Sequence, residues 1–119
     1  MKILILDDQK SARRVLKLLL SERSYAEVLE ADSLESAKAV VESQNVDLCL
    51  VDVRLSENST DRGGLEFLAY LRSGGRSIPA VMVTASTELA EVREAMRRGA
   101  QDYVLKDELS PEMLLPIVD

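Results

Sequence analysis

Five short apolar runs, each followed by a segment with helical periodicity, constrain the fold of this chain more than any other feature. The runs cover residues 3–6, 28–31, 48–53, 80–83 and 103–105. Most are continuous rather than alternating, which is typical of strands buried on both faces of a parallel sheet. Strand and helix alternate five times, and right-handed connections place helices on both faces of such a sheet. The pattern therefore predicts a doubly wound α/β fold.

The segments between the runs predict helices with recognisable ends. Asp32 or Ser33 is expected to cap the second helix, and Ser86 or Thr87 the fourth. Pro116 is expected to interrupt the last helix, because proline lacks the N–H that a helix interior needs. The apolar side chains expected to face the core in the first four helices are Ala12, Val15, Leu16, Leu19 and Leu20; Leu34, Ala37 and Val41; Leu65, Leu68 and Leu71; and Leu89, Val92 and Met96.

Composition narrows the class of protein. The 119 residues show no internal break, so we expect one domain over residues 1–119, either complete or as a fragment of a longer protein. The net charge of −6 argues against nucleic-acid binding by this domain. The chain has no histidine, which excludes Ser-His-Asp triads and phosphohistidine chemistry on its own residues. It has one cysteine and no apolar run long enough for a signal peptide or membrane span, so we expect a soluble cytoplasmic protein.

The candidate functional residues all stand at the carboxyl ends of predicted strands. Asp7 and Asp8 follow the first strand, Asp52 lies at the end of the third, Thr84 follows the fourth and Lys106 follows the fifth. Ligands of open α/β sheets bind at this edge, where the strand order reverses. Taken singly, each residue is also consistent with a helix cap or an ordinary loop side chain. Together they indicate a site.

Three carboxylates at one edge of a sheet need a cation. Two like charges about 4 Å apart repel by roughly 4 kcal/mol at an effective dielectric near 20. Carboxylate oxygens select Mg²⁺ or Mn²⁺ over zinc, and Mg²⁺ keeps positions for water and phosphate. Lys106 and Thr84 add an ammonium and a hydroxyl suited to phosphate oxygens. The cluster therefore predicts phosphoryl chemistry, in which one carboxylate can be the nucleophile.

Four segments resemble the receiver domain of bacterial response regulators, the signalling proteins of two-component systems. They read ILILDD, LCLVDVRL, IPAVMVTA and GAQDYVLK. The resemblance covers nearly the whole chain and implies a flavodoxin-like fold with a five-stranded parallel sheet in the order 2-1-3-4-5. It also implies a signalling switch that accepts a phosphoryl group, and no enzyme activity beyond its own phosphorylation and slow autodephosphorylation.

The resemblance implies a role for each residue of the phosphoryl site. Asp52 corresponds to the phosphoacceptor, and Lys106 to the lysine that holds a phosphoryl oxygen. Thr84 corresponds to the switch hydroxyl that moves toward the phosphoryl group, and Tyr103 to the aromatic side chain that reports activation. The face around Thr84 and Tyr103 is therefore expected to change conformation on phosphorylation.

A metal set is implied in the same way. Asp8 corresponds to a direct Mg²⁺ ligand, and Asp7 to one that binds mainly through water. Asp52 and the backbone carbonyl of Arg54 complete the set. Mg²⁺ is the expected cofactor, with Mn²⁺ as a substitute.

The implied partners are a sensor histidine kinase or a histidine phosphotransfer protein as donor, and an output domain or partner protein downstream. A homodimer is a further option, and direct binding to nucleic acid or membrane is not expected. Two other classes stay open. The first is a Mg²⁺-dependent phosphohydrolase, which would need an acid–base aspartate where Arg54 stands. The second is a receiver that no longer accepts phosphate and acts only as an interaction module.

Several positions depart from the family pattern. Ser56 replaces a usual proline and opens a longer loop that ends at Gly64. This loop is either a tolerated insertion or a contact for the kinase or a partner domain, and its charged residues are Glu57, Asp61 and Arg62. Asp107 stands where proline often follows the site lysine. Arg54 and Ser86 occupy variable positions that, in the family, tune the access of water to the phosphoryl group.

Overall fold

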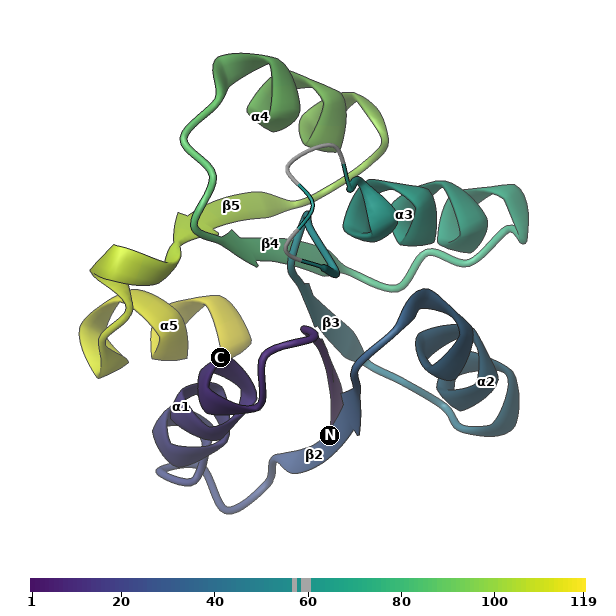
Figure 1. Cartoon of the computed structure of the whole chain (residues 1–119). Coiled ribbons are helices and arrows are strands. Elements are labelled where there is room, and N and C mark those ends of the chain that lie inside the picture. Colours follow the sequence, from purple (N-terminus) through teal and green to yellow (C-terminus); the bar gives the residue numbers. More distant parts are fainter. Residues whose placement is uncertain (57, 59–60) are drawn as a thin grey trace.

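A parallel sheet forms the centre of the computed structural model, which describes residues 1–56, 58 and 61–119 (Figure 1). Within these residues the strands lie in the order β2-β1-β3-β4-β5, as predicted. The strands are β1 (Lys2–Leu6), β2 (Glu27–Ala31), β3 (Leu48–Val51), β4 (Ala80–Thr84) and β5 (Asp102–Leu105). The third strand is shorter than the predicted 48–53, so Asp52 lies just beyond its end.

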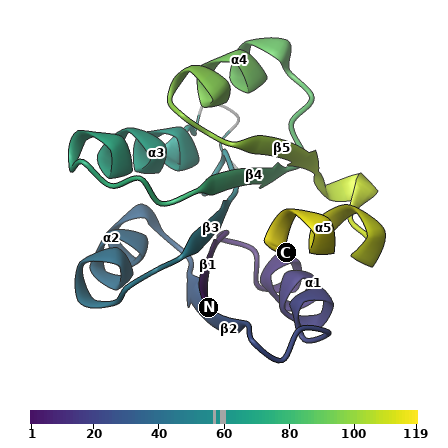
Figure 2. The same ribbon diagram turned by 180° about the vertical axis from the view of Figure 1, so that it is seen from behind.

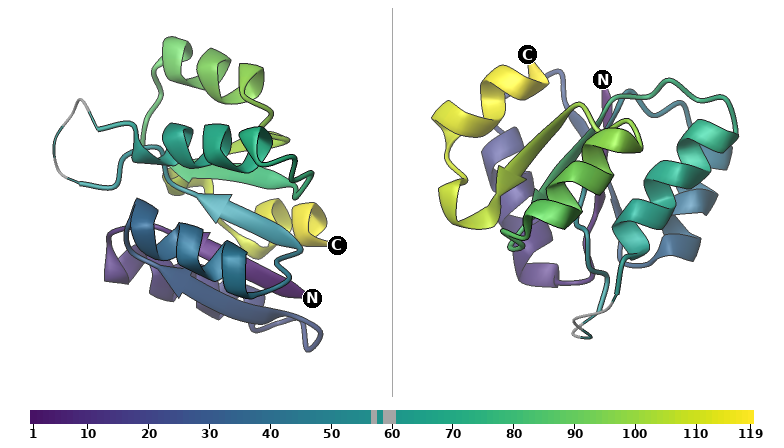
Figure 3. Two further views of the ribbon diagram at one scale, coloured as in Figure 1. Left: turned by 90° about the vertical axis from the view of Figure 1, so that its right-hand side faces the viewer. Right: turned by 90° about the horizontal axis from the view of Figure 1, so that it is seen from above.

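Helices cover both faces of the sheet. Helices α1 and α5 lie on one face, and α2, α3 and α4 lie on the other (Figures 2 and 3). The helices are α1 (Lys10–Leu20), α2 (Leu34–Ser43), α3 (Gly63–Ser73), α4 (Leu89–Arg97) and α5 (Pro111–Val118), with a short 3₁₀ helix, η1 (Lys106–Glu108), after β5. In the described parts of the chain, no helix has the length and apolar character needed to span a bilayer. The doubly wound α/β prediction is confirmed.

Alternate side chains of the central strands point into two separate hydrophobic cores. Leu4 and Leu6 of β1 point into the core under α2, α3 and α4, whereas Ile3 and Ile5 point into the core under α1 and α5. Each such side chain contributes roughly 1.5–3 kcal/mol when it is fully buried. The edge strands β2 and β5 are only partly buried, because each has a neighbour on one side alone.

Local sequence signals fix most helix ends. Ser33 caps α2, where its hydroxyl accepts a hydrogen bond from the Ser36 N–H at 3.1 Å. Ser110 caps α5 in the same way. Helix α4 begins at Leu89, later than the predicted caps, with Glu88 as its preceding residue. Helix α5 continues through Pro116, contrary to the predicted interruption, because its apolar side is anchored in the core and only one helical hydrogen bond is lost.

The predicted inward faces of α1 and α4 are partly wrong. Val15 of α1 is 47% exposed, and Leu89 and Met96 of α4 are 61% and 46% exposed. Helix α4 instead buries Glu91 and Ala95 against the neighbouring elements. The helix is therefore rotated relative to its apolar pattern, so that an acidic residue lies inside and two large apolar residues lie outside.

Candidate functional site

Strand register brings the carboxylates of β1 and β3 together. Leu6 pairs with Val51, the last residue of β3, and the Asp52 N–H donates to the Leu6 carbonyl at 2.9 Å. Because both strands are parallel and end at the same edge, the following residues Asp7 and Asp52 stand side by side. The geometry predicted from the strand ends is therefore present.

The three aspartates form one cluster. Carboxylate oxygens of Asp7, Asp8 and Asp52 all lie within 4.8 Å of one another, an arrangement that can hold a metal ion. Asp7 and Asp52 are 1% and 7% exposed, whereas Asp8 is half-buried. Asp8 is therefore the most solvent-exposed of the three carboxylates.

Lys106 joins the cluster from the end of β5. Its Nζ donates to Oδ2 of Asp52 at 2.8 Å, and it lies 2.8 Å from Oδ2 of Asp7. The second contact is an ion pair without hydrogen-bond alignment, so Asp7 Oδ2 is buried with no hydrogen-bond partner among the described residues. The other oxygen, Asp7 Oδ1, accepts from the Gln9 N–H at 2.9 Å. One lysine thus faces two buried carboxylates and satisfies only one of them fully.

The electrostatics of the cluster favour additional positive charge. Burial raises the pKa of the Asp7 carboxyl, and the charge of Asp52 adds to this effect, while Lys106 and the Gln9 N–H oppose it. Burial lowers the pKa of Lys106, but its contacts with Asp52 and Asp7 outweigh burial and raise that pKa overall. Both shifts favour the protonated form, as expected where three carboxylates face a single lysine. A hard divalent cation fits this oxygen donor set.

Gly64 allows α3 to approach the backbone beside Asp52. The Gly64 N–H donates to the Val53 carbonyl at 2.9 Å, and a Cβ at Gly64 would lie 1.8 Å from the Asp52 carbonyl oxygen. Only glycine fits at this distance. This role of Gly64 was not predicted from the sequence, although two glycines at the start of a helix are a signal of close packing.

Thr84 and Tyr103 are connected through the segment that follows β4. The Thr84 side chain is buried, and its hydroxyl accepts a long 3.4 Å hydrogen bond from the Ser86 N–H. The Tyr103 hydroxyl donates to the Ser86 carbonyl at 3.0 Å. The Thr84 and Tyr103 side chains therefore both form hydrogen bonds with the backbone of Ser86.

The Arg54 side chain contacts two acidic residues at the start of α4. Its Nη2 lies 3.3 Å from Oε2 of Glu91 and 3.3 Å from Oε1 of Glu88. The predicted metal role concerns its backbone carbonyl and stays a prediction. The buried Glu91 was not among the predicted site residues, because an acid on the inner face of a helix has no counterpart in an apolar periodicity.

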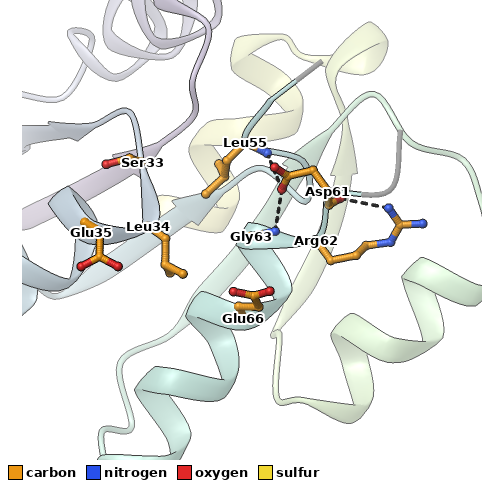
Figure 4. A pocket seen from close by; sticks show the side chains of 8 residues that line it. All are labelled: Ser33, Leu34, Glu35, Leu55, Asp61, Arg62, Gly63 and Glu66. Atoms are coloured by element: carbon orange, nitrogen blue, oxygen red, sulfur yellow. Dashed lines mark hydrogen bonds between the residues drawn. The ribbon is translucent and has the colours of Figure 1, made fainter. Parts of the chain in front are cut away.

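Among the described residues between β3 and α3, Asp61 joins the two sides of the connection. Its carboxylate accepts hydrogen bonds from the Leu55 N–H at 3.1 Å, the Gly63 N–H at 2.8 Å and the Ser56 hydroxyl at 2.8 Å. Figure 4 shows Asp61 at the edge of a pocket between this loop and the start of α2. Glu57, the other predicted acid of the loop, lies outside the described residues.

Comparison with known proteins is consistent with this site. The family model "Response regulator receiver domain" matches residues 3–119. The chemotaxis protein CheY1 of Helicobacter pylori is 31% identical over 117 residues, which cover 96% of this chain and 90% of that protein. A response regulator receiver protein from Pseudoalteromonas atlantica superposes with a TM-score of 0.88 at 25% identity, covering 99% of this chain and 93% of that one.

Longer proteins contain the same domain. The alginate biosynthesis transcriptional regulatory protein AlgB of Pseudomonas aeruginosa is 34% identical over 113 residues, which cover 95% of this chain but 24% of that protein. The chain thus spans about a quarter of the length of this relative. Family match, strand order and the carboxylate cluster agree, and the chain belongs to the response regulator receiver domain family.

Proposed function

We propose that this domain accepts a phosphoryl group on Asp52 and changes conformation in response. The observation that carries the proposal is the placement of Lys106 Nζ 2.8 Å from Asp52 Oδ2 and from Asp7 Oδ2, at the sheet edge where three carboxylates converge. The phosphoryl-accepting switch is the standard function of receiver domains, and this arrangement supplies the groups that such a switch needs.

The chemistry is an in-line transfer. A carboxylate oxygen of Asp52 forms a bond to phosphorus while the bond from phosphorus to the donor's imidazole nitrogen breaks. The Lys106 ammonium group, which donates to the Asp52 carboxylate at rest, can then donate to a phosphoryl oxygen instead, because both acceptors are anionic oxygens within its reach. The chain has no histidine, so it receives the phosphoryl group and cannot supply it.

Asp7, Asp8 and Asp52, with the backbone carbonyl of Arg54, would hold the Mg²⁺. Bound there, the ion supplies positive charge to the oxygens of the transferring group. Asp7 Oδ2 is buried and accepts no hydrogen bond from the described residues, and three carboxylates here face one lysine; both observations support this assignment.

The switch is assigned to the segment after β4. The Thr84 hydroxyl can donate to a phosphoryl oxygen on Asp52 once it leaves its long hydrogen bond with the Ser86 N–H. Because the Tyr103 hydroxyl is tied to the Ser86 carbonyl, this movement would change the surroundings of Tyr103. The surface around Tyr103 would thereby report the state of Asp52 to an output domain or partner protein.

The donor is a sensor histidine kinase or a histidine phosphotransfer protein in the cytoplasm. A longer protein in which this domain controls an output domain is part of the proposal, since AlgB-type relatives extend well beyond the matched region. Asp61 and the residues that it bonds, Leu55 and Gly63, follow the acceptor closely in the chain and are a candidate contact for the donor.

Incubation with acetyl phosphate and Mg²⁺, followed by intact mass measurement, tests the proposal. One phosphoryl adduct is expected for the native protein and for the control Asp107→Asn, whose exposed carboxylate lies next to Lys106. No adduct is expected for Asp52→Asn or in excess chelator. An unmodified native protein would reject the acceptor role in favour of an interaction module, and multiple turnover of phosphate esters would favour a phosphohydrolase.

A further inference from the structure

Helix α4 buries one acidic side chain that the phosphoryl chemistry does not use. Glu91 is 3% exposed and occupies the inner face of the helix, next to the buried Ala95. An ionised carboxylate in such a place is strongly destabilising unless cations and hydrogen-bond donors surround it. The contacts of Glu91 therefore show what this carboxylate holds in place.

Its cationic partners both come from the segment that follows the acceptor. Arg62 Nε lies 2.6 Å from Oε2 of Glu91, and Arg54 Nη2 lies 3.3 Å from the same oxygen. Glu88 approaches both guanidinium groups as well, at 3.3 Å and 3.8 Å, but it is an exposed residue. Because exposed ion pairs are weakened by water and salt, the buried Glu91 is the stronger anchor.

The other oxygen of Glu91 reaches the switch segment. Oε1 accepts a short hydrogen bond from the Ser86 hydroxyl, and that hydroxyl oxygen accepts from the Glu88 N–H at 3.3 Å. Ser86 is also the residue whose N–H bonds Thr84 and whose carbonyl bonds Tyr103. One carboxylate thus joins the segment after β3 to the segment after β4.

Arg54 is close enough in the chain to serve a phosphoryl group instead. It follows Asp52 by two residues, a span of at most about 7 Å in extended chain, which an arginine side chain can fold back across. A phosphoryl group is a doubly charged anion with three acceptor oxygens, and guanidinium binds it in a fork. Once Asp52 is modified, two anions compete for the Arg54 guanidinium.

We propose that Glu91 is a positioning residue of the phosphoryl site, one that holds Arg54 and Ser86 in their resting places and so limits the lifetime of the phosphoryl group. This inference rests on the proposed phosphorylation of Asp52. Glu91 keeps the Arg54 guanidinium from covering the phosphoryl oxygens, and water reaches phosphorus more easily as a result. Its hydrogen bond to Ser86 restrains the segment that carries Thr84.

The test compares phosphoryl lifetimes, measured by intact mass after acetyl phosphate is removed. Glu91→Gln keeps the size of the side chain and removes its charge, so Arg54 loses its buried anionic partner. We expect a lifetime about threefold to tenfold longer, since one hydrogen bond to a charged group changes an equilibrium by about tenfold. The matched control is Glu94→Gln on the same helix, which pairs with Arg97 and Arg98 and is expected to leave the lifetime unchanged.

A double variant separates positioning from general loosening of the fold. If Glu91 acts through Arg54, Glu91→Gln added to Arg54→Ala changes the lifetime no further. An equal effect of Glu91→Gln with and without Arg54 would overturn the proposal, and so would an unchanged lifetime in a folded Glu91→Gln protein. An unmodified native protein would instead reject the phosphorylation of Asp52 itself.

The native protein offers a second readout that needs no variant to fold. The NMR resonance of the Arg54 Nε–H group is expected to shift when Asp52 is phosphorylated, as the guanidinium moves from Glu91 to the phosphoryl group. The corresponding resonance of Arg72 serves as the reference, because its guanidinium donates to the carbonyls of Arg76, Ile78 and Gly99. If the Arg54 resonance shifts no more than the Arg72 resonance on phosphorylation, the proposed exchange of partners is contradicted.

Discussion

Replacing Asp7 with asparagine should make the metal-free domain more stable. Oxygens of Asp8 and Asp52 lie within 4.8 Å of an Asp7 oxygen, so each pair repels by at least about 3.5 kcal/mol at an effective dielectric near 20. Lys106 Nζ at 2.8 Å attracts Asp7 by about 6 kcal/mol on the same scale. Repulsion and attraction nearly cancel, and burial of the carboxylate then leaves Asp7 unfavourable. Asp7→Asn keeps the acceptor for Gln9 and should gain about 1–2 kcal/mol in free energy of unfolding.

Saturating Mg²⁺ should make the native protein more stable than Asp7→Asn. A ligand at one hundred times its dissociation constant stabilises the native state by about 2.7 kcal/mol. The native protein should gain this amount from Mg²⁺, whereas Asp7→Asn, with one negative charge fewer, should gain much less. Urea unfolding followed by circular dichroism, once in chelator and once in saturating Mg²⁺, measures both differences.

The control for this experiment is Asp107→Asn, an exposed aspartate that should change neither value by more than about 0.5 kcal/mol. A lower stability of Asp7→Asn in chelator would refute this prediction, because the three carboxylates would then not repel one another as their spacing requires. An equal gain in stability from Mg²⁺ in Asp7→Asn and in the native protein would also refute it.

Three further predictions follow from other parts of the molecule. Gly64→Ala should lower the free energy of unfolding by about 3 kcal/mol in urea titrations, because the new Cβ meets the Asp52 carbonyl at 1.8 Å and backbone must move; a neutral substitution would contradict this contact. Cys49 is fully buried, and burial raises the pKa of its thiol to about 12. A maleimide should therefore label Cys49 only in unfolding concentrations of urea, and rapid labelling of the native protein would refute its burial. Contacts with Arg23 and Tyr25 lower the pKa of Asp119 to about 2, so the stability that this carboxylate adds should be present above pH 4 and lost as pH falls toward 2. The Asp119→Asn variant should not show this loss of stability in acid unfolding.

Helix α4 shows where sequence reasoning stopped. Its apolar periodicity predicted that Leu89 and Met96 face inward, yet both are exposed and Glu91 is buried. Periodicity assumes that burial follows the hydrophobic effect alone. Here Arg54 and Arg62, more than 25 residues earlier in the chain, supply the positive charge that makes a buried carboxylate tolerable, and Ser86 adds a hydrogen bond. No pattern within the helix contains that information.

The sequence by itself determined the fold class, the strand order through its family resemblance, and the meeting of three aspartates and one lysine at one edge of the sheet. It could do so because each strand is a continuous apolar run and each candidate group follows a strand end, so that parallel pairing alone brings Asp7, Asp52 and Lys106 to one edge. The tertiary structure alone decided that Lys106 contacts both Asp7 and Asp52, and that Glu91 is buried. Both depend on distances between segments far apart in the chain, and electrostatic energy is set by those distances rather than by residue type.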